Sequence, residues 1–105
     1  PKSARFDHSP TRTIADGLIL EHPHPPVQQR ITDLGIAVHL VADSDICAAM
    51  KDLWATHALI VEPSSAITLA FVHAHLNELP EPICVILTGE NIARDDFFRL
   101  ISASA

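Results

Sequence analysis

Apolar side chains recur every three or four positions in four stretches of the chain, the spacing that places them on one face of a helix. This pattern predicts helices over residues 27–34, 43–54, 64–76 and 95–101. Gly35 is well placed to end the first helix, and Pro63 suits the first turn of the third. The third helix is apolar on nearly every side, which predicts that it is buried. In the last helix, Phe97, Phe98 and Ile101 are expected to point inward.

Two shorter runs, residues 36–41 and 83–87, are apolar at almost every position. Strands that are buried on both faces have this composition, as in a parallel sheet. Strands that alternate with helices imply parallel pairing and right-handed crossovers. The sequence therefore predicts an α/β fold, a partial three-layer parallel sheet with flanking helices. We expect one partial domain over residues 1–105, with residues 1–12 flexible.

Composition narrows the class of protein. With 105 residues, 48% of them hydrophobic, and a mean hydropathy of +0.22, the chain is apolar for so small a domain. Such a chain often covers apolar surface with a partner. The net charge of −6 and the scattered basic residues argue against a nucleic-acid partner. No apolar run approaches the roughly 18 residues of a membrane helix. Cys47 and Cys84 are isolated and are expected to be small buried groups in a reducing cytosol.

Three short strings place small or polar residues where an apolar run ends. They are Thr-Ile-Ala-Asp-Gly at 13–17, Val-Glu-Pro-Ser-Ser-Ala at 61–66 and Val-Ile-Leu-Thr-Gly-Glu-Asn at 85–91. Each string alone also fits an ordinary turn or helix start. In this order and spacing, however, residues 13–101 resemble the C-terminal part of the threonine/serine dehydratases, which are pyridoxal-phosphate enzymes of fold type II. Residues 41–50 resemble a further helix start of that family.

The resemblance implies four cofactor-binding residues. Gly17 would bring its backbone close to the cofactor ring, where a side chain would collide. Glu62 would lie near the ring at the start of the third helix. Thr88 would replace the family's serine, with its hydroxyl bonded to the pyridine nitrogen, and Gly89 follows it in the same string. Glu90 stands where the family has a second glycine, a departure that bears on the choice of substrate.

The resemblance also implies an activity, β-elimination of a hydroxy amino acid to a 2-oxo acid and ammonia, in a cytoplasmic homo-oligomer. A hydroxyl at Thr88 cannot protonate the ring nitrogen as a carboxylic acid can, which suits elimination better than transamination. The only lysines, Lys2 and Lys51, do not match the lysine that holds the cofactor in this family. The glycine-rich phosphate loop and the family's metal ligands have no counterpart either. We therefore assign no catalytic residue and expect these 105 residues to be inactive alone, completed by the rest of the catalytic chain or a second subunit. A start at Pro1 fits such a separated segment.

Other interpretations stay open. One alternative is a non-catalytic interaction module that retains half of this fold, and another is a related pyridoxal-phosphate racemase or β-replacement enzyme. A receiver-type domain is disfavoured, because neither apolar run ends in Asp. No metal site is predicted. His22 and His24 flank a proline, and His73 and His75 lie about 200° apart around a helix, so the latter pair cannot bind one ion together.

Overall fold

The computed structural model describes residues 12–20 and 22–103. A short 3-10 helix, η1 (Asp16–Leu18), precedes four α-helices, α1 (Pro25–Asp33), α2 (Asp43–His57), α3 (Pro63–His75) and α4 (Arg94–Ala103). The four predicted helices are all present, although their ends differ from the prediction by a few residues. Gly35 follows α1 with φ +62°, and its N–H donates to the Thr32 carbonyl, which confirms its role at the helix end.

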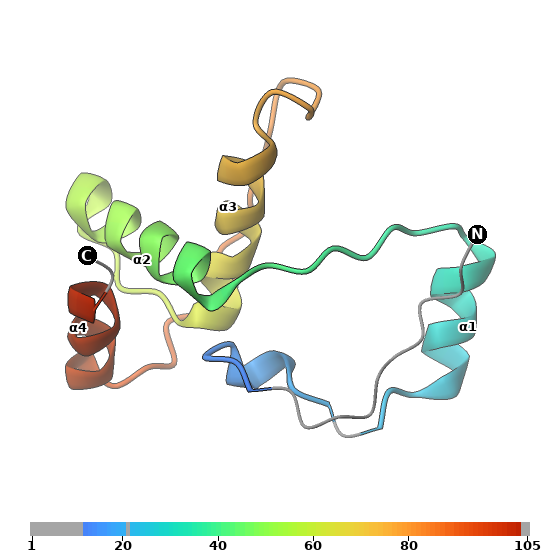
Figure 1. Ribbon diagram of the computed structural model, residues 1–105, viewed down its shortest axis with the longest axis horizontal. Coiled ribbons are helices and arrows are strands. Elements are labelled where there is room, and N and C mark those ends of the chain that lie inside the picture. Colours follow the sequence, from blue (N-terminus) through green and yellow to red (C-terminus); the bar gives the residue numbers. More distant parts are fainter. Residues whose placement is uncertain (1–11, 21, 104–105) are drawn as a thin grey trace.

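The predicted α/β fold is wrong, because the described residues contain helices and no strand. Residues 36–41 run as an extended segment between α1 and α2, as Figure 1 shows. Leu40 in this segment is 98% exposed, and Ile86 in the segment 83–87 is 73% exposed. A strand exists only when a neighbouring segment accepts and donates its backbone hydrogen bonds. Neither segment has such a neighbour in the described part of the chain, so the partial parallel sheet does not form.

The described chain is open rather than tightly packed. Figure 1 shows α1 set apart from the other helices, and α1 contains no buried residue. The radius of gyration is 15.1 Å, whereas a compact domain of this length has a radius near about 13 Å. The total accessible surface is 8233 Å², compared with about 5,800 Å² for a compact monomer of this mass. The excess surface includes many large apolar side chains.

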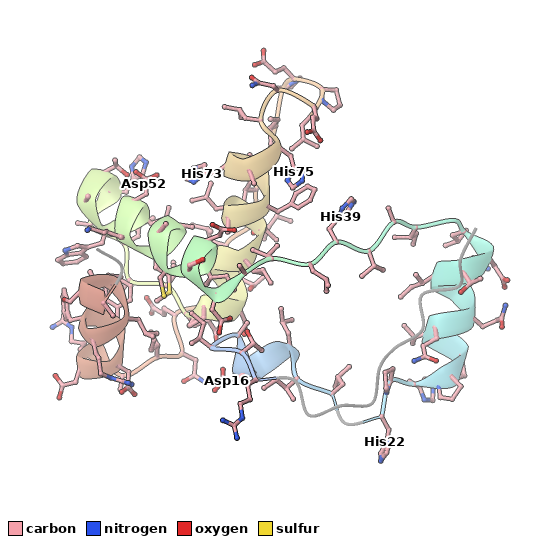
Figure 2. All side chains as sticks on the ribbon, in the orientation of Figure 1. Asp16, His22, His39, Asp52, His73 and His75 are labelled. Carbon is pink, nitrogen blue, oxygen red and sulfur yellow. The ribbon has the colours of Figure 1, made fainter. Side chains whose placement is uncertain are left out.

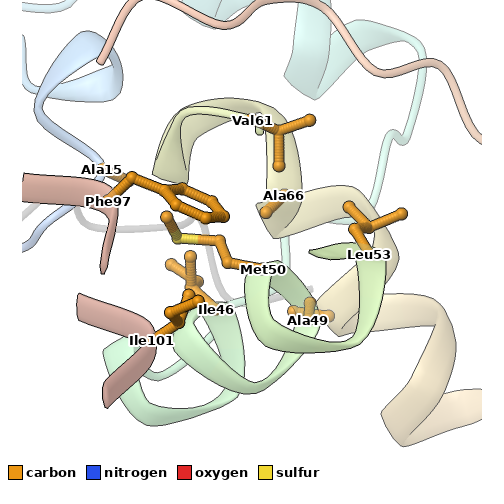
Figure 3. Close-up of a cluster of buried hydrophobic side chains, with 10 residues drawn as sticks. Ala15, Ile46, Ala49, Met50, Leu53, Val61, Ala66, Phe97 and Ile101 are labelled. Atoms are coloured by element: carbon orange, nitrogen blue, oxygen red, sulfur yellow. The ribbon is translucent and has the colours of Figure 1, made fainter. Parts of the chain in front are cut away.

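The core lies where α2 meets α3 and α4 (Figure 3). The predicted stripe of α2 is confirmed, with its buried members Ile46, Ala49, Met50 and Leu53 facing this core. Phe97 and Ile101 of α4 are buried against it, also as predicted. Phe98 is 37% exposed, so its predicted inward orientation is wrong. It packs edge-on against Trp54 instead, with ring centroids 5.2 Å apart.

Helix α3 is buried along one side of its first two turns and not all round, contrary to the prediction. Its buried residues are Pro63, Ser65, Ala66 and Ala70, while Leu76, which follows the helix, is exposed. Among the described elements only α2 and η1 pack against it. An apolar composition predicts that a helix is buried only if other segments pack around it. Too few described segments pack against α3 to bury all of its sides. None of the helices in the described ranges is long and apolar enough to cross a membrane.

Candidate functional site

The start of α3 joins the three sequence strings that lie far apart in the chain. The Gly17 N–H donates to the Ser64 hydroxyl at 3.1 Å. The Gly89 N–H donates to the Ser65 hydroxyl at 3.4 Å, and the Glu62 N–H donates to the Gly89 carbonyl at 3.2 Å. Three of the four predicted site residues therefore meet around the first turn of α3.

Steric crowding explains the glycine at both loop positions. A Cβ added at Gly17 would lie 2.9 Å from the Ser64 Oγ. A Cβ added at Gly89 would overlap the Glu62 carboxylate oxygen and would lie 3.5 Å from its Cδ. Both backbones approach α3 so closely that a side chain has no room unless its neighbour moves. The absence of a side chain at each glycine therefore leaves room for an oxygen of an α3 side chain.

The fourth predicted residue, Thr88, precedes Gly89 and is exposed. Its hydroxyl has no hydrogen-bond partner among the described residues, so it is accessible to a ligand from solvent. Glu62 is half-buried and occupies the position before Pro63 at the start of α3. Glu90 is exposed, and its carbonyl accepts a hydrogen bond from the Ile92 N–H at 2.8 Å.

Sequence reasoning missed the role of Asp43. The Asp43 carboxylate accepts a hydrogen bond from the Thr13 hydroxyl at 2.5 Å and is also bonded by the Ile14 N–H at 3.2 Å. Asp43 is the first residue of α2, and no side-chain cap bond is made at this helix start. Asp43 thereby fixes the first residues of the loop that carries Gly17. The sequence showed only a carboxylate at a helix start. Its hydrogen-bond partner, Thr13, lies 30 residues earlier in the chain.

Ser65 was also missed as an individual residue. Its side chain is 1% exposed, and it is the buried polar residue among the described core positions. A buried hydroxyl is costly unless it is hydrogen-bonded, and the Gly89 N–H supplies a partner. The adjacent Ser64 faces Gly17 instead. The two neighbouring serines in the string 61–66 were the available signal.

The two cysteines differ in environment. Cys84 is exposed, so the prediction that it is buried is wrong, and Cys47 is partly buried on α2. Burial raises the pKa of the Cys47 thiol, and the nearby Asp43 charge raises it further. The thiolate is the reactive form, so a raised pKa lowers the thiolate fraction at a given pH.

We therefore expect iodoacetamide to alkylate Cys84 before Cys47 at neutral pH. Asp43→Asn should move the pH profile of Cys47 alkylation to lower pH, because it removes the charge that disfavours the thiolate. Mass spectrometry of each cysteine peptide measures both rates. Asp45→Asn, in the same helical turn, is the matched control. A profile that rises at every pH without moving its midpoint would indicate a gain in exposure rather than an electrostatic effect.

The histidines face different neighbours (Figure 2). His73 lies 3.8 Å from the Asp52 carboxylate on α2. His75 stacks on Phe71 with ring centroids 4.1 Å apart and lies 6.1 Å from His39. His73 and His75 therefore point to opposite sides of α3, as their spacing predicted. The described residues include no group of three or more metal-binding side chains arranged to hold an ion.

Comparison with known protein families identifies the class. The family model for pyridoxal-phosphate dependent enzymes matches residues 2–89. The match spans the first two strings and ends at Gly89, inside the third. The chain belongs to the family of pyridoxal-phosphate dependent enzymes. A search of curated proteins found no match.

The residues at the start of α3 fit a wall of a site for this cofactor. Gly17 and Gly89 carry no side chain of their own, and oxygens of Ser64 and Glu62 fill the space where a Cβ would stand. Thr88 offers an exposed hydroxyl beside them. Lys2 lies outside the described residues, and Lys51 is an exposed residue in the middle of α2. The covalent anchor of the cofactor is therefore not among the residues that meet at this wall.

Proposed function

We propose that residues around the start of α3 form one wall of a pyridoxal-phosphate site in an ammonia-lyase that acts on a hydroxy amino acid. The observation that carries the proposal is the meeting of Gly17, Glu62 and Gly89 at one helix start. Their strings are the ones that resemble the threonine/serine dehydratases. The product would be a 2-oxo acid together with ammonia.

Each residue of the wall has a role in the proposal. Gly17 and Gly89 would present backbone to the cofactor, while side chains of α3 fill the space where their Cβ atoms would stand. The Thr88 hydroxyl binds the ring nitrogen through a hydrogen bond and leaves that nitrogen without a strong acid beside it. Glu62 holds a negative charge against Gly89 at the edge of the wall. When bound, pyridoxal phosphate supplies the electron sink for breaking bonds at the amino-acid α-carbon.

The wall needs further protein to become a complete site. We propose that the rest of the catalytic chain, or a second subunit, supplies the lysine and the phosphate contacts. The large exposed apolar surface supports this proposal, because side chains such as Leu40 and Ile86 are costly to leave in water. A homo-oligomer in the cytoplasm would suit the proposed chemistry, and the amino acid would be the small-molecule partner.

The test uses the protein at its natural length, mixed with pyridoxal phosphate and then with threonine or serine. The expected result is a new absorbance band at longer wavelength than the band of the free cofactor. Release of a 2-oxo acid should follow when the amino acid is added. Inversion of the amino acid without release of the acid would instead identify a racemase. Absence of any cofactor band in a protein that binds another macromolecule would favour the interaction module.

Thr88→Ala gives a sharper measurement within the same assay. We expect the substitution to weaken cofactor binding or slow elimination by about 1–3 kcal/mol, the cost of one lost hydrogen bond once the cofactor and the rest of the site cover this exposed hydroxyl. Thr56→Ala is the matched control, because the Thr56 hydroxyl bonds the Asp52 carbonyl within α2. Cofactor affinity and turnover that match the unmodified protein would remove Thr88 from the site.

A further inference from the structure

Ser64 and Ser65 are consecutive residues that bond two different loops. On a helix, consecutive side chains diverge by about 100°, so neighbouring residues face different directions. Ser64 accepts the N–H of Gly17, which lies 47 residues earlier, and Ser65 accepts the N–H of Gly89, which lies 24 residues later. The helix start therefore holds one loop with each hydroxyl.

Neither serine serves its own helix as a cap. Helix α3 has no side-chain cap bond at its N-terminus, and Pro63 in its first turn has no N–H to satisfy. A serine at a helix start commonly accepts from the helix's own free N–H groups. Here both hydroxyls accept from glycine N–H groups of other segments. The bonding is tertiary, so its consequence is the placement of the two loops.

We infer that Ser64 and Ser65 are positioning residues that fix the two glycine loops of the proposed cofactor wall, one hydroxyl for each loop. The inference rests on the proposed function in one respect, namely that the wall faces the cofactor. The Ser64 hydroxyl fixes the distance between Gly17 and the start of α3, and the Ser65 hydroxyl fixes the distance between Gly89 and the same helix start. Glu62, bonded through its N–H to the Gly89 carbonyl, adds a second attachment for the later loop only.

This difference between the loops gives a specific expectation. The Gly17 loop is held by Ser64 and, at its beginning, by Asp43. The Gly89 loop is held by Ser65 and by the Glu62 N–H. Removing one hydroxyl should therefore loosen its own loop and leave the other in place. A general loss of core packing would instead loosen both loops together with α2.

Hydrogen–deuterium exchange on the protein at its natural length tests this inference. Ser64→Ala should speed exchange in peptides that contain Gly17 by about three- to tenfold, with peptides that contain Gly89 unchanged. Ser65→Ala should show the reverse pattern. Ser102→Ala is the matched control, since its hydroxyl bonds the Phe98 carbonyl within α4. Ser64→Thr keeps the hydroxyl and should restore slow exchange at Gly17.

Cofactor binding provides the second readout. Pyridoxal phosphate should slow exchange in both loops of the unmodified protein, and Ser64→Ala should weaken its binding by about three- to tenfold, with recovery in Ser64→Thr. Equal acceleration of both loops and α2, or no acceleration in either alanine variant, would overturn the inference. Loop-specific exchange without any response to the cofactor would keep the positioning role and reject the proposed function. If pyridoxal phosphate slows exchange in both loops but the alanine variants exchange at the rate of the unmodified protein, the positioning role alone is rejected.

Discussion

Replacing Phe97 with alanine will lower the free energy of unfolding by about 3–5 kcal/mol, the cost of deleting a fully buried aromatic side chain. Phe97 is 0% exposed and joins α4 to the core on α2. Its ring lies beside Met50 in the close-up of the core (Figure 3) and 6.1 Å from the Trp54 ring, edge to face. Among the described residues, Phe97 is the largest fully buried side chain.

Urea unfolding, followed by the fluorescence of Trp54, measures this loss. Small domains are stable by about 5–15 kcal/mol, so Phe97→Ala will leave little folded protein if the parent is at the lower end. Phe97→Leu keeps most of the volume and should cost only about 1.5 kcal/mol, which keeps the measurement within range. Phe98→Ala is the matched control, because Phe98 is partly exposed. Equal losses for the two phenylalanines would mean that α4 is not anchored through Phe97.

The helices could be predicted because their signals are local. The apolar stripe of α2, the proline that opens α3 and the glycine after α1 act within a few residues of the elements they define. The runs 36–41 and 83–87 have the composition of buried strands, but strand formation depends on a second segment at hydrogen-bonding distance. The sequence of a run does not show whether a second segment lies beside it. Here none does among the described residues, so Leu40 and Ile86 are exposed.

In the candidate site, too, local signals were visible in the sequence and long-range contacts were not. The strings indicated Gly17, Glu62 and Gly89, and the structure brings these residues together at one helix start. The bonds that hold them there come from Asp43 and the two serines. Their partners lie between 24 and 47 residues away. A residue type at a helix start can suggest a cap, but only the fold reveals that the same oxygen bonds a distant loop.

Gly89→Ala should displace the Glu62 carboxylate and disrupt the proposed cofactor wall while leaving the helices folded. The new methyl group would overlap the end of the Glu62 side chain, which is flexible enough to swing away. We therefore expect a loss of only about 1 kcal/mol in the free energy of unfolding, at the low end for overpacking. Cofactor affinity should fall about tenfold or more, since both the backbone surface at Gly89 and the charge of Glu62 are disturbed.

A double-mutant cycle with Glu62→Ala separates these two disturbances. Shortening Glu62 removes the overlapping carboxylate, so Gly89→Ala should cost almost nothing in stability when Glu62 is already alanine. The expected coupling between the two sites is about 0.5–1 kcal/mol. Gly35→Ala is a control of the opposite kind, because its Cβ would meet open space and only its φ of +62° resists the change. Additive losses at Gly89 and Glu62 would show that the carboxylate does not lie against the glycine in solution, and the wall would then lack its charged edge.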